Sequence, residues 1–230
     1  MPNWHPDELD FITTHYGRGT TPFQMCPPRL FGEIARINSL RARRAAVVAT
    51  NNNQPQPQEE THTILQRIHT FSPQHWASSK PAANDDWRLV GRIYQAAVAI
   101  YCTRSLPASP PSSLPNNTQS PLHNLTTQQI LLHELLGTAL ANNRIQRFLL
   151  WPLVVHGVEA RHGDGRTRAF VQEQLCEMSR QVGSYAPLAA KGVLERFWAS
   201  GGTGWDACFE RPCLFLNQFA VDMIGISPEP

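Results

Sequence analysis

The sequence lacks the short motifs on which many enzymes depend. It contains no Gly-x-Ser-x-Gly, no Gly-x-x-x-x-Gly-Lys-Ser/Thr and no His-Glu-x-x-His, which are the patterns of hydrolase nucleophiles, phosphate-binding loops and zinc proteases. His133-Glu134 is followed by Leu135-Leu136-Gly137, so no second histidine completes a zinc motif. We therefore predict no catalytic residue.

Long apolar segments are missing as well. The longest, Phe148 to Val155, is far shorter than the roughly 20 residues that a membrane-spanning helix needs. Residues 1–17 carry Asp7, Glu8 and Asp10 and have neither a basic start nor an apolar core, so they do not resemble a signal peptide. We expect a soluble intracellular protein without a membrane partner.

Neither sign of charge dominates, because 20 Lys and Arg stand against 18 Asp and Glu and the formal net charge is +2. Binding through nucleic-acid phosphates usually requires clustered positive charge on a clearly basic domain. The basic group Arg41, Arg43 and Arg44 is explained more simply by a solvated helix face. We expect no direct DNA contact by this chain.

Cysteine is scarce, and its spacing fits neither a disulfide framework nor a metal cluster. No Cys-x-x-Cys occurs among the five cysteines, at positions 26, 102, 176, 208 and 213. An odd number in a reducing compartment favours free thiols, several of them buried. Cys208 and Cys213 are separated by five positions with Pro212 between them, so we favour apolar packing over metal binding there.

His156 and Glu159 form the only acid–base pair that we weigh as a site. Such a pair, three residues apart on a helix, could supply two metal ligands if a second helix offered a matching pair. We expect no matching pair on a comparable helix, and Gly163 follows His162 directly, so we favour a buried, hydrogen-bonded His156 and predict no metal or cofactor. Enzyme activity is a third hypothesis, and it rests on this pair alone. Glu159 has a simpler role available, which is to pair with Arg147, Arg166 or Arg168 and so hold helices together.

Apolar residues recur at the spacing of helix faces in most of the chain. The stripes are Leu30, Ile34 and Ile37; Ile64, Ile68 and Phe71; Val90, Tyr94, Ala97 and Tyr101; Val171, Leu175, Met178 and Val182; and Leu194, Phe197 and Trp198. These stripes predict amphipathic helices that must bury their faces against neighbours. The fold class is therefore all-α, an array of packed antiparallel helices formed as αα-hairpins.

Two polar segments, at about 50–61 and 105–121, interrupt the helices. Both are rich in Pro, Asn, Gln or Ser, a composition that cannot bury enough apolar surface to offset the entropy of ordering. Since the stripes resume after each segment, we expect mobile, disordered insertions within a single domain over residues 1–230.

Several residues predict where helices begin or end. Ser72-Pro73 and Asp85 have the character of helix starts, Gly163-Asp164-Gly165 that of a stop and turn, and Gly201-Gly202 that of a stop. Trp205 opens a last segment that reaches Phe219 and Met223. Pro152 lies inside an apolar run, so the helix either kinks there or begins anew, and we favour the kink.

Five segments carry a family resemblance. They are Leu30 to Asn38, Trp87 to Tyr101, Trp151 to Ala160, Arg168 with Phe170-Val171, and Leu194 to Trp198 with Trp205-Asp206. In this order the chain resembles, over Pro27 to Phe219, the C-terminal regulatory domain of fungal binuclear zinc-cluster transcription factors. The most specific of these segments is Trp151 to Ala160, in which an aromatic residue and Pro-Leu precede Gly-x-Glu-Ala. The six-cysteine DNA-binding cluster of such factors is absent from the sequence.

The resemblance implies a helical domain in the nucleus that modulates transcription. Expected partners are proteins of the transcription machinery or a zinc-cluster factor, with a small-molecule effector and a second copy of the chain as further candidates. The alternative hypothesis is a helical domain that binds an apolar small molecule without a direct transcriptional role. The candidate side chains for a pocket, for packing or for interaction are Trp87, Arg92, Trp151, His156, Glu159, Phe197, Trp198 and Trp205.

Overall fold

A computed structural model of the chain describes residues 26–49, 58–80, 84–106, 125–163 and 165–209. Every regular element in these ranges is a helix, so the all-α prediction is confirmed. The chain divides into two compact units, unit 1 up to Ala139 and unit 2 from Leu140. The single domain over 1–230 stays a prediction. Of the helices described, none combines the length and hydropathy needed to cross a bilayer.

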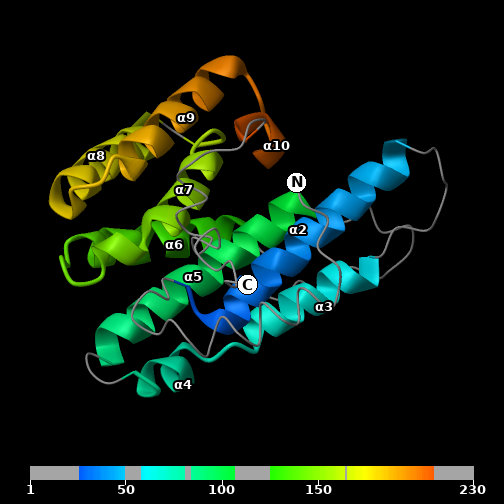
Figure 1. Cartoon of the computed structure of the whole chain (residues 1–230), viewed down its shortest axis with the longest axis horizontal. Helices are drawn as coiled ribbons and strands as arrows, with labels where there is room; N and C mark the ends of the chain where they lie inside the picture. The colour runs from blue at the N-terminus through cyan, green and yellow to red at the C-terminus, as the bar shows by residue number, and fades with distance from the viewer. Residues whose placement is uncertain (1–25, 50–57, 81–83, 107–124, 164, 210–230) are drawn as a thin grey trace, which may run out of the picture. The chain divides into compact units, whose positions relative to one another are not determined.

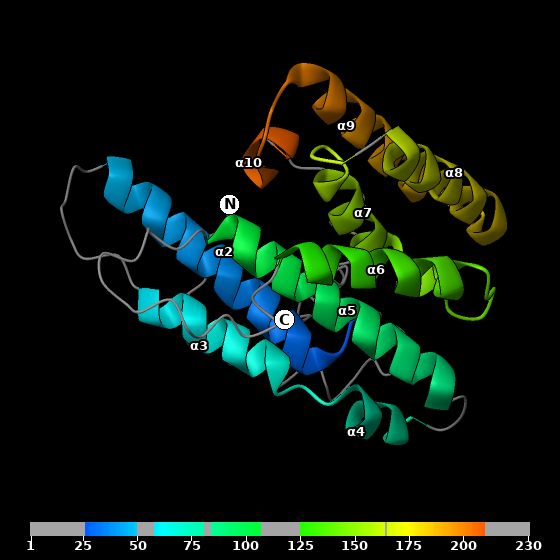
Figure 2. The ribbon, with the colours of Figure 1, turned by 180° about the vertical axis from the view of Figure 1, so that it is seen from behind.

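Unit 1 is built from long helices around α5. Its elements are α2 (Pro28–Ala49), α3 (Gln58–His69), α4 (Pro73–Ser78), α5 (Asn84–Ser105) and, apart from its last residue, α6 (Leu125–Leu140). Helices α2 and α3 lie side by side and run in opposite directions, and both pack against α5 (Figures 1 and 2). The short helix α4 packs against α5 as well.

Helix α5 is the centre of unit 1. From Val90 to Cys102 nearly every side chain is buried, the exceptions being Arg92 and Gln95. A helix that is apolar on almost all sides needs neighbours on almost all sides, and α2, α3 and α4 provide them. The predicted stripes of α2 and α3 face the core, with Leu30, Ile37 and Ile68 fully buried, although Ile34 is only half-buried.

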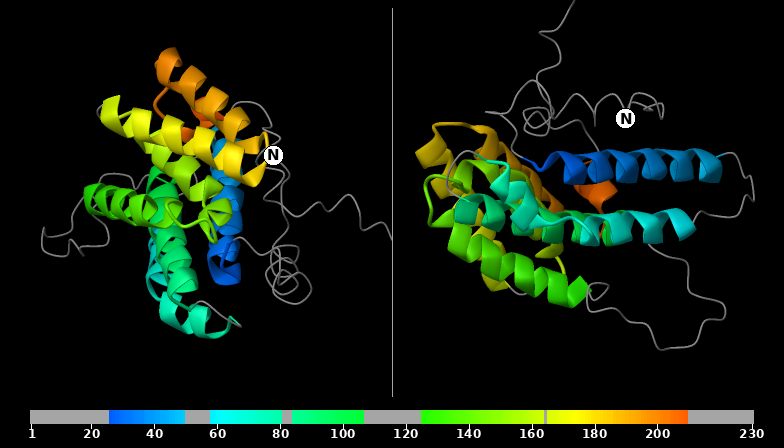
Figure 3. Two further views of the ribbon diagram at one scale, coloured as in Figure 1. Left: turned by 90° about the vertical axis from the view of Figure 1, so that its left-hand side faces the viewer. Right: turned by 90° about the horizontal axis from the view of Figure 1, so that it is seen from below.

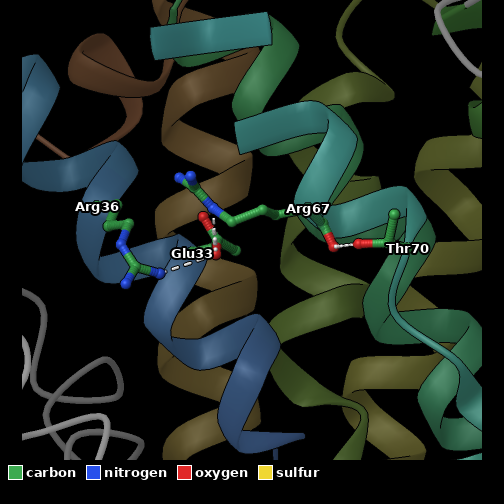
Figure 4. Close-up of polar contacts among 4 residues, drawn as sticks. All are labelled: Glu33, Arg36, Arg67 and Thr70. Atoms are coloured by element: carbon green, nitrogen blue, oxygen red, sulfur yellow. Dashed lines mark hydrogen bonds and ion pairs between the residues drawn. The ribbon is translucent and has the colours of Figure 1, made fainter. Parts of the chain in front are cut away.

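A buried carboxylate joins α2 to α3. Glu33 Oε1 accepts from Arg36 Nη1 at 2.8 Å, on its own helix, and from Arg67 Nε at 2.9 Å, on α3 (Figure 4). The Glu33 side chain is 6% exposed, while the two arginines are 36% and 40% exposed. The second oxygen, Oε2, is buried and has no hydrogen-bond donor among the described residues. The carboxylate therefore depends on these two guanidinium groups for its stability in the interior.

Tyr101 makes a second polar link, between α5 and α2. Its hydroxyl donates to Asn38 Oδ1 and accepts from Arg41 Nη1 at 2.7 Å. Arg44 donates to Thr61 Oγ1 at 3.1 Å, and only Arg43 of the basic group is exposed. The expected solvated face is therefore wrong for Arg41 and Arg44, because the packing of α3 and α5 against α2 turns these side chains into interhelical hydrogen-bond donors.

Unit 2 surrounds a short buried helix. Its elements are η3 (Gln146–Phe148), α7 (Leu150–Glu159), α8 (Gly165–Val182), α9 (Ala186–Ser200) and α10 (Trp205–Cys208). Helices α8 and α9 run side by side in opposite directions, and both contact α7 (Figures 1 and 3). All residues of α7 except Trp151 are buried, so α7 is the centre of this unit.

Most of the predicted helix signals are confirmed. Ser72 is the N-cap of α4, and its hydroxyl accepts from His75 N at 3.1 Å. Gly201 ends α9 with φ of 83°, a left-handed conformation that glycine adopts without strain. Helix α7 ends at Glu159 and α8 begins at Gly165, and the two helices pack against each other, so the predicted helix stop before α8 is confirmed.

The kink predicted at Pro152 is wrong, and the alternative of a new helix start is right. Pro152 is the third residue of α7, and the first intrahelical bond runs from Leu153 N to Leu149 O at 2.9 Å. The first-turn amides of a helix have no intrahelical partner. Proline is therefore tolerated there without loss of a hydrogen bond.

Other predicted boundaries shift by small amounts. Helix α5 begins at Asn84, so Asp85 lies in its first turn and pairs with Arg88 at 3.0 Å instead of capping it. Helix α3 begins at Gln58, inside the first predicted loop, and Glu60 in its first turn interacts favourably with the positive end of the helix dipole. Val182 is 43% exposed because α8 ends there. Residues 50–57 and 107–121 of the two predicted loops lie outside the described residues, as do Cys213, Phe219 and Met223.

Three of the predicted free thiols are buried: Cys26, Cys102 and Cys208. Burial, and secondly the Glu33 carboxylate, raise the pKa of the Cys102 thiol to about 12 against the lowering effect of Arg44 and Arg67. A thiol held neutral in this way is a poor nucleophile and packs as an apolar side chain.

We predict that Arg67→Gln destabilises the protein more than Arg43→Gln. The first variant leaves the buried Glu33 carboxylate with one cation, and we expect a loss of about 1–3 kcal/mol. Arg43 forms an exposed pair with Glu60 at 3.0 Å, with exposures of 58% and 45%, so its loss should be at most about 1 kcal/mol. Urea unfolding of the two variants tests this, and equal losses would contradict the role given to Glu33.

We also predict opposite effects for two glycine substitutions in unit 2. A Cβ at Gly157 on α7 would lie 2.5 Å from Leu194 Cδ1 and 3.2 Å from Val171 Cγ1, both in the core, whereas one at Gly192 on α9 would meet only Arg196 Nη1 at 3.5 Å. Gly157→Ala should therefore cost about 1–3 kcal/mol through overpacking. Gly192→Ala should be neutral or stabilise by up to about 1 kcal/mol through helix propensity. If both variants shifted the urea unfolding midpoint in the same direction, the close approach of α7 to its neighbours at Gly157 would be refuted.

Candidate functional site

The eight candidate side chains fall into both units. Trp87 and Arg92 lie on α5 in unit 1. In unit 2, Trp151, His156 and Glu159 lie on α7, Phe197 and Trp198 on α9, and Trp205 begins α10. The sequence analysis named these eight residues as one set of candidates. In the structure they form two separate sets, one in each unit.

Trp198 and Arg161 form a reciprocal link between α7 and α9. The indole Nε1 of Trp198 donates to Gly157 O in α7 at 2.9 Å, and Arg161, just beyond α7, donates to Trp198 O at 2.6 Å. The Arg161 guanidinium also lies 5.9 Å from the centroid of the Phe197 ring. Carbonyls in the last turn of a helix lack intrahelical donors, so each helix supplies what the end of the other needs.

Arg168 stabilises the same end of α7 from α8. Its Nε donates to Ala160 O and its Nη2 to Arg161 O, both at 3.1 Å. A guanidinium placed at a helix C-terminus also interacts favourably with the helix dipole. The Arg168 guanidinium thus donates to backbone carbonyls. The pairing of Glu159 with an arginine stays a prediction.

The other candidates of unit 2 pack in its interior or at its edge. His156 is 4% exposed, with its ring edge-on to Phe170 at 6.2 Å between centroids. Phe197 is 2% exposed, and Trp205 is 7% exposed and stacks on Phe209 at 5.2 Å. Trp151 is half-buried and Glu159 is buried. In the ranges the structure describes, no three His, Cys, Asp or Glu side chains gather in a way that could hold a metal ion.

Trp87 belongs to an aromatic group between α4 and α5. Its ring packs edge-on against Trp76 at 5.7 Å, and Lys80 Nζ lies 5.0 Å from the Trp76 ring and 5.3 Å from the Trp87 ring. Burial lowers the pKa of Lys80. The stacked cation and rings stabilise the connection between the two helices. Sequence reasoning missed Lys80, since nothing in its local pattern indicates two tryptophans around it.

Arg92 lies at a cleft of about 290 Å³ within unit 1. The cleft is bounded by α5, by the end of α3 and the residues just after it, and by α6, and its lining residues are His69, Phe71, Arg92, Gln95, Ala96, Ala99, Gln128 and Leu131. Arg92 is exposed, whereas the other residues from Val90 to Cys102 are buried apart from the half-buried Gln95. Among the lining residues that the structure describes, Arg92 has a positive charge and none is an Asp or Glu.

Two glutamines that sequence reasoning missed give the cleft its polar groups. Gln95 Nε2 donates to three carbonyls at the end of α3, those of Ile68 at 2.8 Å, His69 at 3.3 Å and Phe71 at 3.0 Å. Gln128 on α6 is 6% exposed. Gln128 follows the predicted loop, and a polar residue there carries no sequence signal of burial.

Comparison with known proteins identifies the kind of domain. The model of the family described as fungal specific transcription factor domain matches residues 5–211. The chain is also 43% identical over 223 residues to the phomenoic acid biosynthesis cluster-specific transcriptional regulator of Leptosphaeria maculans. That alignment covers 97% of this chain and 42% of the relative, so the chain spans about two fifths of the relative's length. No solved structure matches the chain.

We predict that Trp198→Phe destabilises unit 2 by about 1–3 kcal/mol, because it leaves the buried Gly157 carbonyl without its indole donor. Trp76→Phe is the matched control. It removes the same atoms from a half-buried indole whose N–H has no hydrogen-bond partner among the described residues. Because the smaller ring in Trp76→Phe also weakens the contacts with Lys80 and Trp87, we expect Trp198→Phe to lose more stability than this control in urea unfolding, and an equal or smaller loss would contradict the role of the hydrogen bond.

Proposed function

The chain belongs to the fungal-specific transcription factor domain family, and on that premise we propose that it regulates transcription in the nucleus through other proteins. The observation that carries the proposal is the family match over residues 5–211, a range that includes every helix described. The relative is a cluster-specific transcriptional regulator, and regulation of a biosynthetic gene cluster is the corresponding role for this chain. Both the family and the relative are regulators of transcription, not enzymes.

The charge of the chain supports action through protein partners. A formal net charge of +2 over 230 residues does not favour binding to phosphates. Its basic residues, 18 arginines and two lysines, are nearly balanced by 18 Asp and Glu. A regulatory domain with little tendency to bind DNA changes transcription by contacting proteins, namely the transcription machinery, a zinc-cluster factor or a second copy of itself.

A specific observation favours a second function, the sensing of a small molecule. The cleft beside Arg92 combines apolar walls with a few polar groups, as ligand sites do. An effector bound there would make the regulatory activity depend on a metabolite.

A fusion of the whole chain to a heterologous DNA-binding domain tests the regulatory role. We expect the fusion to raise or lower expression of a reporter that carries the matching DNA site. Gly157→Ala should reduce this effect, because overpacking lowers the folded fraction. Gly192→Ala makes the same chemical change at an open position and should leave the effect intact.

Fusion protein levels must be compared in the same cells, so that degradation is separated from loss of activity. A fusion that accumulates and leaves the reporter unchanged under every nutrient condition would contradict the proposed function. Equal activity of the two glycine variants, despite different stability, would contradict its dependence on the fold.

A further inference from the structure

The cleft in unit 1 contains a cation that the described residues do not neutralise. Arg88, one turn earlier on α5, pairs with Asp85 at 3.0 Å and contacts Gln74 Oε1 at 3.5 Å. Arg92, four residues on and on the same side of α5, has no ion pair or hydrogen bond within the described ranges. Residues four apart on a helix are neighbours, so this side of α5 has two guanidinium groups and one carboxylate.

The walls of the cleft favour an organic ligand over a bare inorganic anion. Phe71, Ala96 and Ala99 line it and are themselves at most 5% exposed, and Leu131 adds a half-buried side chain from α6. Hydrocarbon in the cleft would remove from water the small apolar area that these side chains still expose, and the gain in free energy is proportional to that area. A hydrated inorganic ion would leave the wall in contact with water.

Gln128 adds a polar group that the fold does not use. It is 6% exposed and lines the cleft, and it makes no hydrogen bond to any residue in the described part of the chain. Buried polar side chains are normally hydrogen-bonded, and a carboxamide can both donate and accept. Gln95, by contrast, already donates to three carbonyls and so holds its place in the wall.

The volume limits the size of the ligand. About 290 Å³ lies at the lower end of the range for small-molecule sites. We propose that this cleft binds a small organic acid, whose carboxylate pairs with Arg92 and Gln128 and whose apolar part covers Phe71, Ala96 and Ala99. A regulatory consequence of this binding rests on the proposed function, but the binding itself does not.

Octanoate is a suitable probe, with 1-octanol and octylammonium as controls of the same chain length and different charge. In calorimetric titrations of the whole chain we expect saturable binding of octanoate, with 1-octanol and octylammonium each at least about tenfold weaker. A charge-assisted hydrogen bond to a carboxylate typically accounts for a difference of this size. Failure of octanoate to saturate the protein at millimolar concentration would overturn the proposal, as would equal affinity for 1-octanol.

Variants of the two arginines assign the carboxylate contact. Arg92→Gln should weaken octanoate binding at least about tenfold, while Arg88→Gln, which removes the same charge from the same side of α5, should change it less than about twofold. Arg92→Glu should reverse the preference, so that octylammonium binds more tightly than octanoate. Since Arg92 is exposed, its variants should keep the wild-type unfolding midpoint. Unchanged octanoate affinity in Arg92→Gln would place the ligand elsewhere and overturn the proposal.

These titrations separate this proposal from the regulatory one. Octanoate binding that depends on Arg92, by a chain whose fusion leaves a reporter unchanged, would support the ligand site and contradict the regulatory function. Reporter regulation by a chain that does not bind octanoate would do the reverse.

Discussion

The carbonyl groups at the ends of buried helices are the constraint on which the rest of this structure depends. The last carbonyls of a helix have no intrahelical donors, and a buried one left unsatisfied costs about 1–3 kcal/mol. Here neighbouring helices supply the donors: Gln95 of α5 for the end of α3, and Trp198 of α9 and Arg168 of α8 for the end of α7. Because each donor fits one helix end, these hydrogen bonds select one arrangement of the helices from the many that apolar helix faces alone would allow.

The same constraint explains why the centres of the two units differ. Helix α7 has ten residues, so much of its backbone is near an end, and its C-terminus needs side chains from both α8 and α9. Helix α5 has 22 residues, and its interior satisfies its own backbone. Its polar links are therefore made by side chains, such as Tyr101 with Asn38 and Arg41 on α2. The buried Glu33 has a similar role between α2 and α3, where its charge requires Arg36 and Arg67.

The sequence predicted whatever depends on neighbours along the chain. Helix faces such as Leu30 with Ile37, the cap at Ser72 and the stop at Gly201 follow from local spacing and local backbone chemistry, and all are present. At Pro152 a local rule was ambiguous, since proline fits the first turn as well as it kinks an interior. The contacts of Trp198 and Gln95 join residues that lie 41 and 24 to 27 positions apart. Only the packing of whole helices determines such contacts, and no local pattern contains them.

This division bears on where specificity can reside in such a domain. Three of the residues that carry the family resemblance use their polar groups in hydrogen bonds between helices: Glu33, Arg168 and Trp198. A side chain whose polar group holds two helices together cannot bind a ligand or a partner through that group without a loss of protein stability. Arg92 and Gln128 are placed differently, since they line a cleft and the described part of the fold does not use their polar groups. Substitutions at positions of this kind can change what a domain recognises while the helix-end hydrogen bonds, and with them the fold, stay as they are.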